Sequence, residues 1–222
     1  MQSREDALKP SVMIGDAAAD AAPAPGEDDL AELLRRAMET IGTGMQADEC
    51  LMLCQYAMSV TAGAIVEIGS FQGCSTVLLG LTSKHVNGLP VFAVDPHAES
   101  VGVFGGAVGP YDRVLLLQNL LRFEVAEVVR PVGLPSEQAC RAWEGDIGLL
   151  WIDGDHSYQA TMNDFAGWSP FVPVGGLVLF HDAADPEIGP FRAIEEILTT
   201  GAYRELPGIR SLRALQKVEA TA

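Results

Sequence analysis

The sequence predicts an α/β fold: a doubly wound, mostly parallel sheet preceded by N-terminal helices. Three observations support this prediction. Short β-branched runs alternate with longer helical patterns, as in parallel strands joined by crossover helices. The runs are almost continuously apolar, so both faces of the sheet should be covered. Finally, 48% of the 222 residues are hydrophobic, enough for a full core without disulfide or metal. The runs lie at residues 64–68, 90–95, 127–132, 147–153 and 175–182.

Two helices are expected before the first run. From Asp29 the apolar residues recur at helical spacing, and the helix should end near Gly42 or Gly44. A second helix is expected over about 47–60. We therefore expect residues 29–60 to form N-terminal helices of the same single domain.

The two ends of the chain differ in character. Residues 1–28 are rich in Ala, Pro, Asp and Glu without a sustained period, which predicts a mobile acidic tail. An arm that orders on assembly is the alternative. After the fifth run come a helical segment from about 190 to 200 and a final run at 211–218. The core of the domain should therefore extend over 64–222, within one domain at 29–222.

Charge and composition limit the partners. Lys plus Arg number 14 against 30 Asp plus Glu, a formal net charge of −16, and no basic stripe is present. This excludes a typical nucleic-acid binder and disfavours anionic membranes. No apolar run or leader pattern suggests a spanning helix or export, so a cytoplasmic location is expected. The cysteines, with no CxxC spacing, are expected to be apolar residues rather than metal or redox groups: Cys50, Cys54, Cys74 and Cys140.

The first two strands end in residues suited to a nucleoside ligand. Glu67 opens the segment EIGSFQGCST, where glycines permit a tight turn before a helix N-terminus. Its carboxylate disfavours a pyrophosphate and favours an amine or sulfonium. Asp95, in VDPH, follows Glu67 by 28 residues and is positioned to accept two ribose hydroxyls. A purely structural turn and a helix cap are the respective alternatives.

The next two strands end in carboxylates and imidazoles. LLWIDGDHSY (149–158) and GGLVLFHD (175–182) should bring polar groups to adjacent strand ends, about 4.8 Å apart. Such a cluster suits a hard divalent cation and a general base. The alternative is that these groups only cap helices, as Ser157 should do for a helix through Trp168. The predicted cluster consists of Asp153, Asp155, His156, His181 and Asp182.

Taken in order, VEIGSFQGCST, VFAVDPH and LLWIDGDHSYQATMNDFAGWSPFVPVGGLVLFHD resemble class I S-adenosylmethionine-dependent methyltransferases. The similarity is to the group related to macrolide and aminocoumarin sugar O-methyltransferases and CmcI-type proteins, over roughly 45–198. It implies a Rossmann-like methyltransferase with a seven-stranded, mostly parallel sheet. It also implies S-adenosylmethionine and Mg²⁺ as cofactors, a small-molecule acceptor such as a glycosylated natural product, and a homo-oligomer.

The resemblance also implies individual roles. His156 matches the general base of the macrolide enzymes, whereas the aminocoumarin relatives favour the position of Asp155. Metal ligands would be Asp153, His181 and Asp182, although relatives usually have Asp or Glu at position 181. Imidazole suits softer metals, so a transition metal, fewer carboxylate ligands or a metal-free enzyme are open alternatives. Cofactor-binding residues would be Glu67, Gly69, Ser70, Gly73, Ser75, Asp95, Pro96, Ser136 and Asp153.

The expected function is O-methylation of a hydroxyl, of a sugar in particular, on a small-molecule natural product. Two alternatives stay open: a non-catalytic, CmcI-like cofactor-binding protein, and a nicotinamide-dependent oxidoreductase. The absent GxGxxG pattern and the acidic Glu67 disfavour the second. The acceptor pocket is expected from segments 45–56, 101–111 and 183–190, with 101–111 as a mobile gate.

Overall fold

The computed structural model describes residues 29–101 and 106–219. The tail predicted for residues 1–28 lies outside the described residues, as does the central part of the gate predicted at 101–111. The flanks of that gate form a two-stranded hairpin that the sequence did not predict, β3 (Ser100–Val101) with β4 (Ala107–Val108).

Both predicted N-terminal helices are confirmed. Helix α1 spans Leu30–Thr40, and the Asp29 side chain caps it by accepting a hydrogen bond from the Ala31 amide. Helix α2 spans Ala47–Ser59. At its start the Glu49 carboxylate accepts a hydrogen bond from the Gln46 amide, which satisfies a free donor of the first turn.

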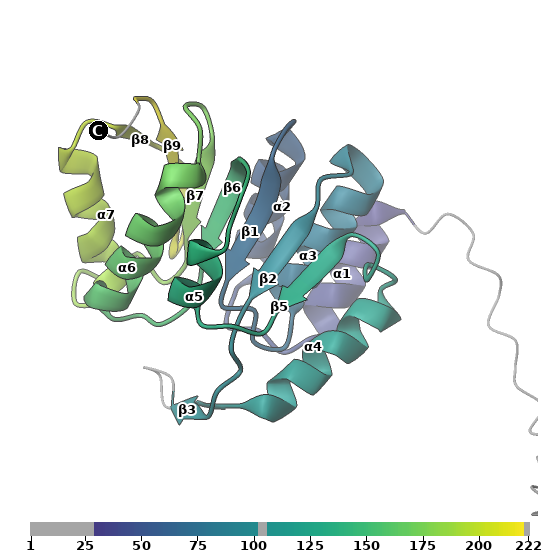
Figure 1. The fold of residues 1–222 in the computed structure, drawn as a ribbon. Coiled ribbons are helices and arrows are strands. Elements are labelled where there is room, and N and C mark those ends of the chain that lie inside the picture. Colours follow the sequence, from purple (N-terminus) through teal and green to yellow (C-terminus); the bar gives the residue numbers. More distant parts are fainter. Residues whose placement is uncertain (1–28, 102–105, 220–222) are drawn as a thin grey trace, which may run out of the picture.

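The main sheet has seven strands in the order β5-β2-β1-β6-β7-β9-β8 (Figure 1). The first five in this order are parallel, whereas β9 runs antiparallel to β7 and β8 antiparallel to β9. All five predicted runs are strands, and the final run is β9. The bounds are β1 Ala64–Ile68, β2 Val91–Val94, β5 Val129–Val132, β6 Ile147–Ile152, β7 Leu177–Phe180, β8 Tyr203–Ile209 and β9 Leu212–Lys217.

One strand of the main sheet had no predicted position. Strand β8 has the sequence YRELPGI, and Pro207 with Gly208 is a pattern typical of a turn. The structure accommodates both because β8 is the edge strand, where a missing amide donor costs little, and because its register with β9 shifts between Leu206 and Ile209.

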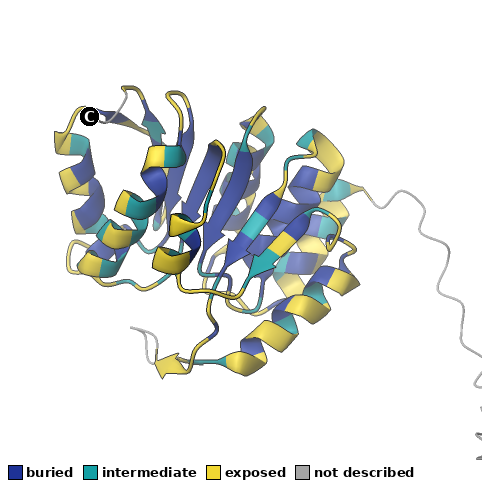
Figure 2. Cartoon of the chain, in the orientation of Figure 1, coloured by how far each residue is buried: buried dark blue, intermediate teal, exposed yellow. Residues whose placement is uncertain are grey.

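Helices cover both faces of the sheet (Figure 1). Leu149 and Trp151 of β6 join the core with α1, α2, α3 (Cys74–Thr82) and α4 (Pro110–Arg122). Leu150 and Ile152 join the core with α5 (Ser136–Arg141), α6 (Tyr158–Trp168) and α7 (Gly189–Thr199). The central strands β1, β6 and β7 are therefore buried along their whole length, as Figure 2 shows and as their apolar runs predicted, whereas the edge strands β5 and β8 are partly exposed.

Three of the four cysteines lie in this core as expected of apolar residues: Cys50, Cys54 and Cys74 are buried, and Cys140 is half-buried. Within the described part of the chain, no helix has both the length and the apolar character needed to cross a membrane.

The parallel strands end together. Four backbone hydrogen bonds continue the ladders one residue past the strand ends: Gly69 N to Val94 O, Asp95 N to Val132 O, Asp153 N to Ile68 O, and His181 N to Ile152 O. Gly69, Asp95, Asp153 and His181 consequently lie side by side along the carboxyl edge, where open α/β sheets bind ligands.

Candidate functional site

The turn after β1 requires glycine at two positions. Gly69 has φ +87°, and a Cβ there would lie 2.2 Å from the Asp153 carbonyl oxygen. Gly73 has φ +90° and precedes α3, and a Cβ there would lie 2.5 Å from a Leu116 methyl group. Both backbone conformations disfavour side chains, and both contacts exclude them. The turn therefore packs directly against Asp153, the residue that follows β6.

Asp95 fixes the shape of this turn. Its Oδ2 accepts hydrogen bonds from the Ser70 amide (2.9 Å) and the Phe71 amide (3.0 Å), and its Oδ1 accepts one from the His97 amide (2.7 Å). His97 is buried, and its Nε2 lies 2.9 Å from the Phe71 carbonyl oxygen. Asp95 thus has the structural role considered as an alternative, and its role toward a ribose stays a prediction.

Glu67 is fully buried beneath the turn. The Thr76 hydroxyl donates a hydrogen bond to Oε2, whereas Oε1 has no hydrogen-bond partner in the described structure. Burial raises the pKa of Glu67 to about 8, and the hydroxyls of Ser75 and Thr76 offset only part of that effect. A buried acceptor atom without a partner at a ligand-binding edge is suited to a positively charged donor.

The other predicted cofactor residues lie around the same edge. Ser70 and Ser75 are buried, whereas Pro96 is exposed. Ser136 begins α5, and its hydroxyl accepts a hydrogen bond from Trp168 Nε1 at 2.9 Å. Burial also raises the pKa of Asp164 on α6 to about 6, with Ser136 acting in the opposite direction. Ser136 therefore joins α5 to α6 near the end of β6.

Four residues of the predicted cluster meet at the ends of β6 and β7. His181 Nδ1 lies 3.2 Å from Asp153 Oδ1 and 3.2 Å from Asp182 Oδ2. His156 Nε2 lies 2.6 Å from Asp182 Oδ2. One ligand atom each of Asp153, His181 and Asp182 lies within 4.8 Å of the other two, a spacing that could hold a metal ion. Two carboxylates and an imidazole are a chemically reasonable donor set.

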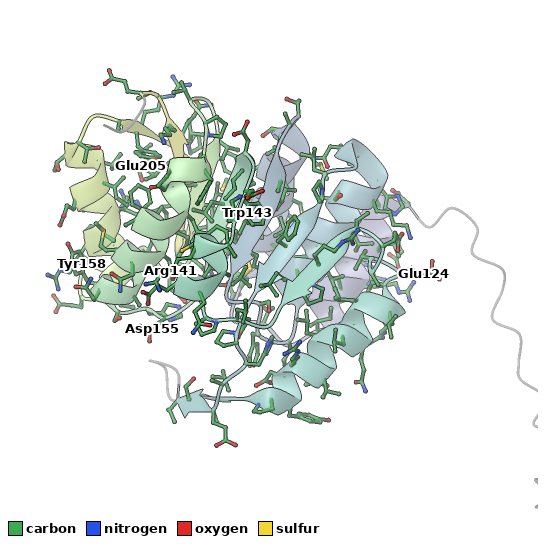
Figure 3. All side chains as sticks on the ribbon, in the orientation of Figure 1. Glu124, Arg141, Trp143, Asp155, Tyr158 and Glu205 are labelled. Carbon is green, nitrogen blue, oxygen red and sulfur yellow. The ribbon has the colours of Figure 1, made fainter. Side chains whose placement is uncertain are left out.

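Asp155 does not belong to this group of ligand atoms. Its side chain is exposed, and its carboxylate accepts a hydrogen bond from the Ser157 amide at 2.7 Å. Figure 3 labels it at the lower left, below the start of α6. Ser157 caps α6 as predicted, with its hydroxyl accepting from the Ala160 amide at 3.3 Å. Asp155 is thus part of the local turn that starts α6.

The charges of the cluster depend on one another. Burial disfavours a charged His181, but hydrogen bonds to Asp153 and Asp182 outweigh it and raise the pKa of His181 to about 11. Burial raises the pKa of Asp182, but the hydrogen bonds and charges of His156 and His181 outweigh burial and hold this pKa below its usual range. For His156, burial lowers the pKa, but the hydrogen bond and charge of Asp182 raise it, and the net shift of the pKa is upward. Asp182 also has φ +49°, an uncommon backbone conformation that occurs at functional sites.

The sequence analysis missed Glu49. This residue of α2 is 2% exposed, and its Oε2 lies 3.5 Å from His181 Nε2. Its Oε1 accepts hydrogen bonds from the amide (2.9 Å) and hydroxyl (2.6 Å) of Ser211. An acidic residue three positions after a helix cap is ordinary, so only the tertiary contact, across 132 residues of sequence, distinguishes Glu49.

The strand order, the glycine turn after β1 and the acidic residue after β2 define the class I S-adenosylmethionine-dependent methyltransferases. A model of the family described as "Methyltransferase domain" matches residues 66–183, just over half of the chain. The chain belongs to this methyltransferase family.

Similar proteins agree with this membership. An uncharacterized protein of Acanthamoeba polyphaga mimivirus is 29% identical over 130 residues, 56% of this chain and 53% of that protein. The chain therefore aligns with about half the length of this curated relative. The O-methyltransferase NovP superimposes with a TM-score of 0.66 at 19% identity, covering 80% of this chain and 82% of NovP.

Two further structures share the fold. The O-methyltransferase from Bacillus cereus in complex with SAH has a TM-score of 0.61 at 17% identity, covering 88% of this chain and 94% of that chain. The calicheamicin methyltransferase CalS11 has a TM-score of 0.61 at 15% identity, covering 88% and 99% respectively.

Proposed function

We propose that the protein transfers the methyl group of S-adenosylmethionine to a hydroxyl oxygen of a small molecule, with a divalent cation at Asp153, His181 and Asp182. The observation that carries this proposal is that Asp153 contacts both the glycine turn and the acidic cluster. Its carbonyl oxygen packs against Gly69 of the glycine turn, while its carboxylate belongs to the acidic cluster. A cofactor over the turn and a hydroxyl over the cluster would be neighbours.

The chain's residues fit the cofactor. The unpartnered Oε1 of buried Glu67, beneath the glycine turn, suits the cofactor's ammonium group. We assign Ser70, Gly73, Ser75 and Pro96 to the same binding edge, Asp95 to the ribose and Ser136 to the adenine, as the family resemblance implies. When bound, S-adenosylmethionine supplies a methyl group on a sulfonium sulfur, and the sulfur leaves as a neutral thioether.

The cluster also fits a divalent cation, because three ligand atoms from two strand ends already converge. A bound cation would supply positive charge that stabilises an acceptor oxygen as it loses its proton. Asp153 and Asp182 would hold it through carboxylate oxygens. His181 would contribute Nδ1, the ring nitrogen that faces both carboxylates.

His156 is the residue that we propose as general base. Its ring faces the cluster, and once a bound cation engages the carboxylate of Asp182, His156 would accept the proton of the acceptor hydroxyl. The negative charge of the carboxylate cluster, with Asp182 Oδ2 2.6 Å from the ring, would stabilise the resulting imidazolium. The rest of the rate enhancement would come from holding oxygen, methyl carbon and sulfur in line. Asp155, engaged at the start of α6, is the weaker candidate for this role.

The acceptor that we propose is a sugar hydroxyl of a glycosylated natural product. Its support is the likeness to CalS11, a TDP-rhamnose 3'-O-methyltransferase, and to the O-methyltransferase NovP. Segments 45–56 and 183–190 flank the cluster and are the proposed acceptor walls. We also propose a homo-oligomer, as the resemblance implies.

An isothermal titration of S-adenosylhomocysteine into metal-stripped protein tests the proposal, repeated with Mg²⁺ and with NADH as the control ligand. We expect micromolar binding of the homocysteine nucleoside and none of NADH. Binding of NADH alone would instead support an oxidoreductase, and absence of all binding would overturn the cofactor assignment. Tight nucleoside binding without transfer to any hydroxyl tested would support a non-catalytic protein.

A further inference from the structure

We infer that Glu49 is a positioning residue for the proposed metal site: it holds the proton of His181 on Nε2, so that Nδ1 is free to ligate a transition-metal dication in preference to Mg²⁺. The inference rests on the proposed function, because it requires a cation at Asp153, His181 and Asp182.

The contacts of His181 determine which of its ring nitrogens can ligate a metal. The ring is only 4% exposed, so water does not surround it. Nδ1 faces Asp153 and Asp182 at 3.2 Å each, while Nε2 faces Glu49 Oε2 at 3.5 Å. A neutral imidazole carries its proton on one nitrogen only, and a ligating nitrogen must be the unprotonated one. Ligation through Nδ1 therefore requires an acceptor for a proton on Nε2, and Glu49 is that acceptor.

Glu49 is held in place from two directions. Its Oε2 also accepts the Gln46 amide at 2.8 Å, and its Oε1 accepts the amide and hydroxyl of Ser211. All of these partners are N–H or O–H donors, so both oxygens of the carboxylate act as acceptors and its position behind the ring is fixed. A fixed carboxylate behind a ligating histidine orients the ring and increases its basicity, the arrangement typical of histidine metal sites.

The donor set then determines which metal is preferred. Mg²⁺ favours oxygen ligands, whereas an imidazole nitrogen increases affinity for transition-metal dications. Where relatives are expected to have a third carboxylate, this chain has His181 with Glu49 behind it. The substitution at position 181 and the buried acid of α2 are thus two parts of one site.

Replacing Glu49 by Gln tests the inference because the amide cannot reproduce these contacts. An NH₂ group at the Oε2 position would face His181 as a donor and favour the proton on Nδ1, which blocks ligation. In the other orientation the NH₂ group would face the Ser211 amide, so that two donors would oppose each other and neither would have an acceptor. We therefore expect Glu49→Gln to weaken Mn²⁺ binding by about 10- to 100-fold.

The measurement uses metal-stripped, full-length protein saturated with S-adenosylhomocysteine. Free Mn²⁺ is followed by electron paramagnetic resonance, and Mg²⁺ binding by calorimetry. Asp48→Asn is the matched control, since Asp48 precedes Glu49 but is 39% exposed and pairs with Arg210. We expect Asp48→Asn to bind Mn²⁺ within about two-fold of wild type, and wild type to prefer Mn²⁺ over Mg²⁺ by at least about ten-fold.

Nitrogen NMR of the His181 ring in Zn²⁺-loaded protein provides a readout that loss of packing would not produce. We expect an Nε2-protonated ring in wild type and loss of that signal in Glu49→Gln. Ser211→Ala, which removes one donor to Glu49 but keeps the carboxylate, should weaken Mn²⁺ only a few-fold, and it tests the inference if Glu49→Gln does not fold.

The outcomes separate the two proposals. Wild type that binds the nucleoside but no dication overturns the metal site and this inference with it. Mn²⁺ binding that is equal in Glu49→Gln and Asp48→Asn overturns only the role of Glu49 and leaves the proposed methyl transfer standing.

Discussion

The two halves of the carboxyl edge satisfy their polar groups in different ways. After β1 and β2, the carboxylate of Asp95 is occupied by backbone amides of its own turns. After β6 and β7, the ionisable side chains of Asp153, His156, His181 and Asp182 face one another. The first half is a shaped backbone surface, as expected for binding a cofactor, whereas the second concentrates charge, as expected where a proton moves.

Replacing His156 by Ala should have the largest effect on turnover. If His156 is the general base, its loss removes the group that accepts the hydroxyl proton, which costs roughly 10²- to 10⁴-fold in kcat. Binding of S-adenosylhomocysteine should stay within about two-fold, since that half of the edge is untouched. Steady-state kinetics and calorimetry check both expectations. Wild-type turnover in this variant would show that the β6 and β7 ends are not the reacting half.

Asp182→Asn should reduce turnover by at least about 100-fold, because even partners of metal ligands cost 10- to 100-fold when removed. Asn is chosen because it tolerates the left-handed backbone of Asp182, where φ is +49°, better than Ala does. Dication binding should fall in parallel, and circular dichroism should be unchanged. Full activity with dication binding lost would mean that the enzyme works without metal.

The same contrast explains which parts of the site the sequence could predict. Gly69, Asp95 and Asp153 end continuous apolar runs, so their positions along one edge follow from local pattern and the geometry of parallel sheets. Strand β8 and Glu49 could not be found that way. The first has turn-like residues tolerated only at a sheet edge, and the second acquires its importance from His181, far away in sequence.

Replacing Glu67 by Gln should change how the stability of the protein depends on pH, without changing the fold. Folding raises the pKa of Glu67 from 4.5 to about 8, so between these values the folded state holds a proton that the unfolded state has lost. Stability of the ligand-free wild type should therefore fall as pH rises from about 5 to 8, by on the order of 3 kcal/mol from this group.

Gln cannot ionise, so the difference in unfolding free energy between wild type and Glu67→Gln should shift in favour of the variant over that pH range. Urea unfolding at both pH values measures it. Titration of S-adenosylhomocysteine into the same variant should show weaker binding if Oε1 contacts the ammonium group. A difference that does not change with pH would mean that Glu67 is ionised in the folded protein.

Asp155→Asn should have the smallest effect, and it separates the two candidate bases. Asn can accept the hydrogen bond from the Ser157 amide, so the start of α6 should be preserved. If His156 accepts the proton, turnover should fall by less than about three-fold. A loss as large as that of His156→Ala, at unchanged nucleoside affinity, would assign the base to Asp155. The reacting half would then extend beyond the strand ends to the exposed turn before α6, and the acceptor hydroxyl would lie over that turn.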